Sequence, residues 1–406
     1  MKRNILVLFA VLYLATVSNL VCAQNSSENK PQVRQKTFEK VWQKVNETYF
    51  DPHFGGVDWK KVHDIYAPKV AQVKSDAELY ALLNKMLGEL KVSHLQILTP
   101  EQIAKLKSPP VATGITVREI ENKIVVTRVL DDSSAVKAGI KNGFVVKKID
   151  GETVKNLKDA KQKLSGAPNT TLHISYLDEK DELREADLER LPLEQSIKGK
   201  LDGISFYAQF EAKRLTDNIG YLRFSNFAGF LDAKIKEAVE SMKDAPGIII
   251  DLRGNSGGED QVAINLAGML FDKQTQLMIT KTRKGEDFYY KAKPTKNPYL
   301  GKIVILADEL SGSASEQFAA GLQETGRAFI IGKTTVGKDL DADLEKLPTG
   351  AYLIYASGEP HTPKGVVIEG RGVIPNKEMN LTRQDLLNGK DAQLEAAIEY
   401  IQTSHP

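Results

Sequence analysis

The sequence predicts an α/β core, a sheet flanked by helices, that is preceded by a helical bundle and an inserted β-rich domain. Three observations carry this prediction. Apolar residues recur at helical spacing near the N-terminus, the period shifts towards two after Pro109-Pro110, and strand–helix units repeat from about residue 201 onward. The 406-residue chain is long enough for two or three domains.

The composition excludes several classes of protein. Hydrophobic residues make up 41% and charged residues 27%, which is typical of globular domains and not of a disordered or multi-span membrane protein. The formal net charge is only +2, and Lys2 and Arg3 account for it. Such a balance gives no reason to expect nucleic acid or an anionic membrane surface as a partner.

Residues 1–23 have the organisation of a secretory signal peptide. Lys2-Arg3 form a basic start, residues 5–16 are a short apolar stretch, and Val21-Cys22-Ala23 suit signal peptidase. We expect cleavage after Ala23 and export to a periplasm or the exterior, with no integral membrane span left. An N-terminal membrane anchor is the alternative, and Val21 is a poor neighbour for lipid attachment at Cys22. Because Cys22 is the only cysteine, the mature chain would contain no disulfide and no thiolate site.

The mature chain divides into four parts. Polar residues 24–35 read as a flexible leader, and residues 36–105 as the helical bundle. In the bundle, Asp58 and Ser75 are expected to cap two of the helices. A β-rich domain spans residues 106–195, and the α/β core spans residues 196–406.

The β-rich domain resembles a PDZ domain. Its expected strands at 123–129 and 172–177 enclose a short helix, a glycine turn, another strand and an Asp-Gly turn, in the order typical of PDZ domains. The resemblance implies that Gly114, Ile115 and Thr116 form a carboxylate loop and a strand edge, to which a substrate C-terminus adds as a strand. The alternative is a domain that only gates the active site or packs against it.

Two strand-to-helix turns of the core carry the candidate chemistry. Ser313 follows an apolar strand, where its hydroxyl can be exposed beside helix N-terminal amides that suit an oxyanion. A capping box is the simpler interpretation, because Glu316 follows three residues later. The second turn ends in Gly257-Gly258, whose backbone can approach a ligand closely. Phosphate binding is its rival use, but the Gly-Lys-Ser/Thr of a P-loop is missing.

Four segments together resemble the tail-specific, or C-terminal-processing, serine peptidases. They are residues 251–258, 313–316, 332–338 and 367–375, and the resemblance extends over roughly residues 36–380. It implies a serine endopeptidase that acts on proteins or peptides through an acyl-enzyme, without a cofactor. Ser313 would be the nucleophile, and amides of Gly257 or Gly258 and of Ala314 would form the oxyanion hole. A non-catalytic binding protein on the same scaffold is the alternative.

The resemblance offers two general bases. The processing branch uses a Ser-Lys dyad, and Lys338 lies 25 residues after Ser313, but Asp339 and Ala342 replace the expected glycine and glutamine. The branch that resembles the tricorn protease core uses a histidine, and Ser93-His94 and Glu369 match it. We favour His94, oriented by Glu369 and assisted by Ser93, with Lys338 as the alternative base. The other histidines lack metal-ligand spacing, so no metal is expected.

Overall fold

The computed structural model describes residues 30–107, 111–131, 133–192, 197–201 and 204–403. The expected signal peptide and most of the expected leader lie outside these ranges. Within them, no helix is both long enough and apolar enough to cross a membrane.

Two compact units make up the described chain. The first contains the residues up to Lys91 together with Leu95–Pro100 and Asp343–Ala356. The second contains Val92–His94, Glu101–Ala342 and the chain from Ser357 onward.

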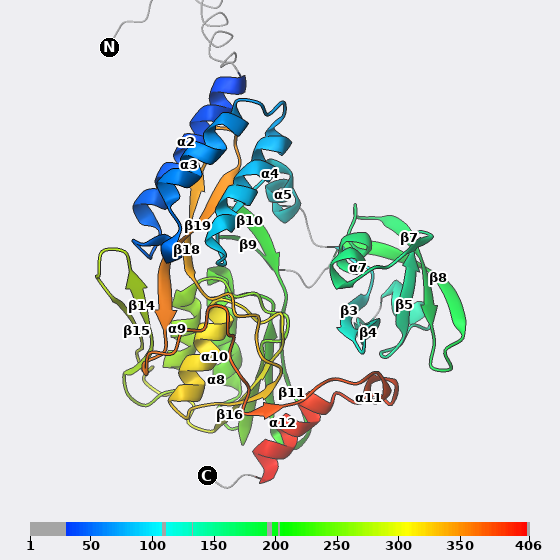
Figure 1. The fold of residues 1–406 in the computed structure, drawn as a ribbon. Helices are drawn as coiled ribbons and strands as arrows, with labels where there is room; N and C mark the ends of the chain where they lie inside the picture. Colours follow the sequence, from blue (N-terminus) through cyan, green and yellow to red (C-terminus); the bar gives the residue numbers. More distant parts are fainter. Residues whose placement is uncertain (1–29, 108–110, 132, 193–196, 202–203, 404–406) are drawn as a thin grey trace, which may run out of the picture. The chain divides into compact units, whose positions relative to one another are not determined.

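The first unit is built on three helices, α2 (Lys30–Thr48), α3 (Trp59–Val70) and α4 (Asp76–Leu87), which lie side by side in Figure 1. As expected, Asp58 caps α3 by accepting the Lys61 N–H at 2.9 Å, and Ser75 caps α4 through the Glu78 N–H at 3.1 Å. Phe38, Val41, Leu79 and Leu83 are wholly buried, because their helical spacing puts them on inward faces.

The helical bundle begins earlier than the sequence predicts. Residues 30–35 were expected in the flexible leader, yet they form the first turns of α2. Pro31 does not prevent this, because a helix tolerates proline in its first turn. Arg34 anchors the segment, since its Nε donates to Asp76 Oδ1 at 2.7 Å.

The first unit also contains a hairpin that was expected to belong to the core. Strand β18 (Asp341–Lys346) pairs with β19 (Tyr352–His361), and the first half of β19 pairs with β1 (Gln96–Leu98). The register joins Gln96 to Ile354 and Leu98 to Tyr352 in antiparallel fashion. This pairing joins strands far apart in the sequence and has no local signature. The prediction that all residues from 196 onward belong to the core therefore did not separate this hairpin.

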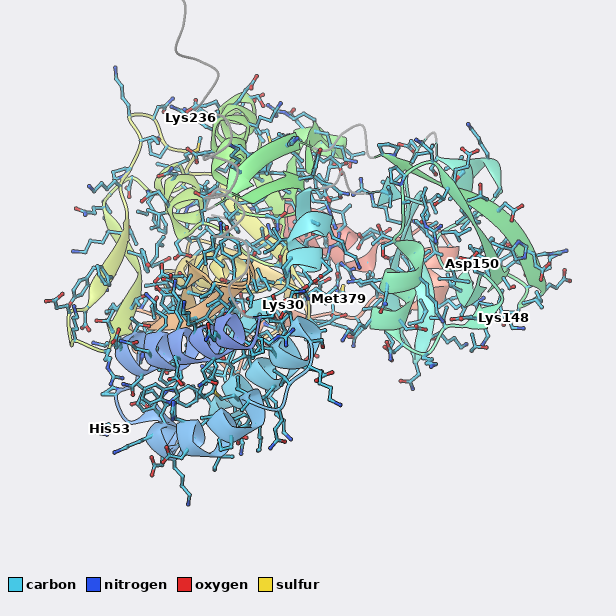
Figure 2. The ribbon with its side chains drawn as sticks, turned by 90° about the horizontal axis from the view of Figure 1, so that it is seen from above. Lys30, His53, Lys148, Asp150, Lys236 and Met379 are labelled. Atoms are coloured by element: carbon cyan, nitrogen blue, oxygen red, sulfur yellow. The ribbon has the colours of Figure 1, made fainter. Side chains whose placement is uncertain are left out.

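In the second unit, the PDZ-like domain has the predicted strands and a free edge. Its main sheet has the order β2-β8-β7-β5-β4-β3, so β3 is an edge strand. Exposed Lys148 and Asp150 lie on either side of the buried Ile149, which is the last residue of the strand at Val145–Ile149 (Figure 2). The strands are β2 (Val111–Ala112), β3 (Ile115–Ile120), β4 (Lys123–Val129), β5 (Val145–Ile149), β6 (Glu152–Thr153), β7 (Thr170–Leu177) and β8 (Leu183–Pro192), and the helices are α6 (Ser134–Lys137) and α7 (Leu157–Leu164).

The core is a sheet of mainly parallel strands with helices on both faces, as predicted. Its order is β11-β12-β13-β16-β17-β20, with parallel pairing from β12 onward. Alternate residues of β13 (Gly247–Asp251) enter different apolar clusters. Ile248 and Ile250 join the cluster of α8 (Asp232–Ser241), α9 (Asp260–Gly268) and α10 (Ala314–Glu324), and Ile249 joins that of α12 (Ala392–Thr403). The strands are β11 (Phe210–Arg214), β12 (Gly220–Phe224), β13 (Gly247–Asp251), β16 (Lys302–Ala307), β17 (Phe329–Gly332) and β20 (Lys377–Glu378).

The remaining elements complete this unit (Figure 1). The second half of β19 pairs with β14, which also pairs with β15. The core helices are α8 (Asp232–Ser241), α9 (Asp260–Gly268), α10 (Ala314–Glu324), α11 (Arg383–Leu387) and α12 (Ala392–Thr403). The other elements are α5 (Pro100–Lys107), β9 (Ile197–Leu201), β10 (Ile204–Ala208), β14 (Thr275–Thr282) and β15 (Phe288–Ala292).

Candidate active site

Ser313 occupies a strained position directly before α10. Its φ of 53° and ψ of −127° lie outside the regions that side-chain-bearing residues favour, and such strain concentrates at functional sites. The Ser313 N–H donates to Lys338 O at 2.9 Å and to Glu316 Oε2 at 3.1 Å. These bonds hold the turn in place and leave the hydroxyl group half-buried at the start of the helix.

Glu316 ties the serine turn to the loop that carries Lys338. Its wholly buried carboxylate accepts N–H groups from Gly337 at 2.8 Å and Lys338 at 2.9 Å, and it also accepts the Thr335 hydroxyl. Burial raises the pKa of Glu316. The capping box expected from Ser313 and Glu316 is present, and it coexists with an arrangement that suits a nucleophile.

Glu369, Ser93 and His94 form a hydrogen-bonded relay. The Ser93 Oγ lies 2.9 Å from Glu369 Oε2 and 2.6 Å from His94 Nδ1, and the Ser93 N–H donates to Glu369 Oε1 at 2.7 Å. An ionised carboxylate only accepts hydrogen bonds. The Ser93 hydroxyl therefore donates a hydrogen bond to Glu369 and accepts one from the His94 Nδ1–H. This assignment leaves the Nε2 lone pair of His94 free to act as a base.

A short main-chain connection links this relay to the serine turn. The Asp339 N–H donates to Glu369 Oε2 at 2.7 Å, and the preceding residue, Lys338, accepts the Ser313 N–H. The structure therefore brings Ser93, His94 and Glu369 into one network with the turn of Ser313. Among the described residues, no hydrogen bond yet joins the side chains of Ser313 and His94, and such bonds often tighten only when substrate is bound.

The surroundings of the two candidate bases differ. Burial lowers the pKa of His94, and the positive charge of Lys338 lowers it further, while Glu369 and Asp341 act in the opposite direction. His94 is therefore neutral near pH 7. The side chain of Lys338, in contrast, is exposed.

Gly258 and Ala314 are better placed as oxyanion donors than Gly257. A Cβ on Gly257 would lie 2.6 Å from the Ser313 Cβ. The loop of residues 254–258, which we call the glycine loop, therefore touches the turn at Ser313, which we call the serine turn. The Gly257 N–H is already engaged, because it donates to Asn255 Oδ1 at 3.0 Å. Within the described chain, the N–H groups of Gly258 and Ala314 have no hydrogen-bond partner, so both can serve an oxyanion.

Two polar residues that the sequence motifs did not single out hold the glycine loop. Asn255 is wholly buried, and its Nδ2 donates to Phe224 O at 3.0 Å while its Oδ1 holds Gly257. Asp308 accepts the Gly254 N–H at 2.8 Å. Each follows the C-terminal end of a parallel strand, which is the available sequence signal, since side chains at these ends meet at one sheet edge.

The PDZ-like domain presents the expected loop and strand. Gly114 has a φ of +85°, and a Cβ there would lie 2.3 Å from Ser133 Oγ, so only glycine fits. Ile115 and Thr116 begin the edge strand β3, and the Ile115 side chain is buried in the domain's apolar cluster. The free backbone edge of β3 has the form that strand addition requires.

Three family models match successive parts of the chain. Residues 31–88 match the tricorn protease C1 domain, residues 111–189 match the PDZ domain, and residues 218–379 match peptidase family S41. The last segment contains Ser313, Lys338, Glu369 and the glycine loop. The matches follow the predicted order of the helical bundle, the PDZ-like domain and the α/β core.

Relatives of known type extend over most of the chain. A carboxyl-terminal-processing protease of Synechocystis sp. is 26% identical over 90% of this chain and 86% of its own length. A probable CtpA-like serine protease of Staphylococcus epidermidis is 25% identical over 95% of this chain and 74% of its own.

Solved structures share the fold. The photosystem II D1 C-terminal processing protease superposes with a TM-score of 0.60 over 91% of this chain and 98% of its own, at 22% identity. The tricorn protease superposes with a TM-score of 0.53 over 92% of this chain and 37% of its own, at 18% identity. From the sequence matches we conclude that the chain is a serine peptidase with a PDZ domain, and that its residues 218–379 are similar to peptidase family S41.

Proposed function

We propose that this protein is an exported serine endopeptidase in which Ser313 is the nucleophile and His94 is the general base. The observation that carries the proposal is the Glu369–Ser93–His94 relay, which meets the Ser313 turn through the main chain of Lys338 and Asp339. Export rests on residues 1–23, whose sequence has the organisation of a secretory signal.

Peptide hydrolysis then proceeds in two steps. His94 Nε2 takes the Ser313 proton as Oγ forms a bond to the substrate carbonyl carbon, and the imidazolium returns that proton to the leaving amine. In the second step the same nitrogen deprotonates a water molecule, whose oxygen bonds to the acyl carbon. The bond from that carbon to Ser313 Oγ then breaks, and the imidazolium returns the proton to Oγ. Ser93 and Glu369 keep the proton on Nδ1 and stabilise the imidazolium, so both are positioning residues.

The developing oxyanion is stabilised by backbone amides. The N–H groups of Gly258 and Ala314, which have no partner among the described residues, are the donors in this proposal, and Gly257 acts by allowing the glycine loop to approach Ser313. The N-terminus of α10 adds partial positive charge at the same point.

The PDZ domain is proposed to capture the C-terminus of protein substrates. The positive φ of Gly114 and the free edge of β3, which Ile115 and Thr116 begin, support this role. An extended peptide would add to β3 as an antiparallel strand, with its terminal carboxylate held by amides of the loop at Gly114.

Two matched substitutions test the choice of base. His94→Gln keeps polarity but removes the base, and we expect kcat/KM towards fluorescein-labelled casein to fall by about 100-fold or more. Lys338→Met keeps the stem of the exposed side chain while it removes the charge, and most activity should remain. The opposite result, with both variants folded, would assign the base to Lys338.

A serine-directed fluorophosphonate separates a peptidase from a binding protein on the same scaffold. The wild-type protein should be labelled, and mass spectrometry should locate the adduct on Ser313. Absence of labelling in folded wild-type protein, together with absence of casein hydrolysis, would overturn the catalytic proposal.

A further inference from the structure

The outer edge of strand β15 borders a cavity that the peptidase mechanism does not use. β15 (Phe288–Ala292) pairs with β14 on one side, and within the described residues no other strand pairs with it. A cavity of about 560 Å³ lies between this strand and the helices α8 and α9. Its volume is in the range of ligand-binding clefts.

Residues from both faces of β15 line this cavity. Tyr290 points inward, where its hydroxyl donates to Asp341 Oδ2 at 3.1 Å. Tyr289 and Lys291 point to the opposite face, because side chains alternate along a strand, and Tyr289 is 55% exposed. Residues of opposite faces meet in one cavity where it follows the edge of the strand. The backbone edge of β15 therefore faces the cavity, beside α9 (Figure 1).

Three lysines give the cavity positive charge. Lys236, which Figure 2 labels at the surface of the core, comes from α8. Lys291 belongs to β15, and Lys293 follows that strand. None of the three forms an ion pair in the part of the chain that the structure describes. Lys291 Nζ lies 5.5 Å from the centre of the Tyr289 ring, a contact that positions the cation without neutralising it.

A single acidic residue, Asp232, is found among the described residues that line the cavity. It lies four residues before Lys236, but its carboxylate is bonded to Asn265 Nδ2, which is 3.2 Å from each of its oxygens. Three lysines against one aspartate leave a formal charge of +2 at the cavity. This excess of one sign favours an acidic ligand.

The floor of the cavity is apolar. Ile235 of α8 and Leu266 of α9 are buried, and Ile264 is half-buried beside them. An extended peptide presents its side chains alternately on two faces. Such a peptide can rest small or apolar side chains on this floor while its acidic side chains reach the lysines at the rim.

One end of the cavity is close to the catalytic elements. Helix α9 follows the glycine loop, and Gln261 of the cavity wall is three residues after Gly258. Three residues of chain span at most about 11 Å between Cα atoms. A polypeptide that occupies this end of the cavity is therefore within a few residues' length of the oxyanion donor at Gly258.

We propose that the cavity binds an acidic, extended segment of a protein substrate, which adds to β15 as a strand and pairs its carboxylates with Lys236, Lys291 and Lys293. An edge strand offers main-chain hydrogen bonds to an extended chain, and the lysines restrict the choice by charge. A second copy of this protein is disfavoured at the same edge, because it would bring the same positive charges. The inference rests on the proposed peptidase function and names a class of substrate.

Binding is measured in Ser313→Ala, which cannot cleave the probe. The probe is a fluorescein-labelled peptide of five Glu-Thr repeats, and its amidated C-terminus keeps it from the carboxylate loop proposed at Gly114. Fluorescence anisotropy should show binding about 10-fold tighter than for the matching Gln-Thr peptide, because glutamine forms no ion pairs. Methylation of alternate backbone nitrogens should also weaken binding, since the added strand then lacks N–H donors. Equal affinities in either comparison would overturn the inference.

Substitutions assign the binding to the cavity. Lys236→Gln, Lys291→Gln and Lys293→Gln remove charge and keep most of the stem, and each should weaken binding of the Glu-Thr peptide by about 2- to 5-fold, as for exposed ion pairs. Lys284→Gln is the matched control, because Lys284 is exposed in the turn of the same hairpin and does not line the cavity. Unchanged affinity in the triple variant, shown to be folded by urea unfolding, would exclude the cavity as the site.

Turnover by the wild-type enzyme tests the role in substrate selection. Two fluorogenic peptides share one cleaved sequence and carry Glu-Thr or Gln-Thr repeats on both sides of it, so the direction of the bound chain does not matter. KM should be about 10-fold lower for the Glu-Thr form with little change in kcat, and the triple variant should remove the difference. Equal KM values would overturn the inference and leave the peptidase proposal standing. Failure of fluorophosphonate labelling would instead count against the catalytic proposal, while binding to Ser313→Ala still tests the cavity.

Discussion

At the scale of single residues, Ser313 and Ser315 share one motif but have different surroundings. Ser313 is half-buried in a strained conformation at the start of α10. The side chain of Ser315 is 1% exposed, and its hydroxyl donates to Asn255 O at 3.0 Å. Sequence alone presents two candidate hydroxyl groups here, and only the three-dimensional structure shows that one of them is engaged in holding the glycine loop.

Alanine substitutions should separate these two serines. Ser313→Ala should lower kcat by about four orders of magnitude or more, because no other group can form the acyl-enzyme. Ser315→Ala loses one buried hydrogen bond, so we expect about 1 kcal/mol less stability and only a small change in kcat. Peptide hydrolysis and urea unfolding of both variants measure this difference, and near-normal activity of Ser313→Ala would contradict the assignment.

The pH profile reports on His94. Because burial lowers the pKa of His94, the acid limb of kcat/KM should have its midpoint below the ordinary value of about 6.5. A peptide without ionisable side chains is the appropriate substrate, since it adds no titration of its own to the profile. An acid limb with a midpoint above pH 8 would contradict this prediction and indicate an amine base.

At the scale of elements, apolar pattern predicted the strands that are buried on both faces and failed for the exposed hairpins. The apolar run at Gly247–Asp251 predicts a strand buried on both faces, and all five residues of the strand are buried. Strand β18 contains Asp341, Asp343 and Glu345, and its pairing depends on a partner in β19 rather than on its own composition. Likewise, Asn255 binds Phe224 O across 31 residues of chain, and Asp308 binds the Gly254 N–H across 54 residues, so the sequence indicates only that each residue follows a parallel strand and not which group it contacts.

Strand β3 yields a prediction about substrate tails. If the loop at Gly114 holds a terminal carboxylate, amidation of a substrate C-terminal peptide should weaken its binding by about 10-fold or more, because charge-assisted bonds to loop amides are lost. Fluorescence anisotropy of the acid and amide forms gives the comparison. Equal affinities would instead favour a domain that only gates or packs.

At the scale of the whole molecule, the acidic residues near the site make stability depend on pH. The pKa of Asp260 is raised to about 7 by burial and by Asp341, and burial also raises the pKa values of Asp339, Asp341 and Glu316. Between about pH 4 and 7 the folded protein therefore binds protons that the unfolded chain has released. His94 acts in the opposite sense, since its pKa is lowered, but it is one group against four.

We therefore expect the free energy of unfolding to fall as pH rises from about 5 through 8. Urea unfolding at pH 5.5, 7 and 8.5 measures the trend. Asp339→Asn should lose less stability over this range than the wild type, because one of the strained carboxyl groups no longer has to ionise. Stability that rises steadily to pH 8.5 would show that these four acidic residues do not carry the pKa shifts.

The relay of Glu369 and Ser93 also has a consequence for synthesis of the chain. The two residues are 276 positions apart, so the ribosome synthesises Ser93 and His94 long before Glu369. A nascent or C-terminally clipped chain carries Ser313 without the carboxylate that orients His94. If Glu369 orients His94 as we propose, proteolytic activity arises only after the chain has been synthesised as far as Glu369 and has folded.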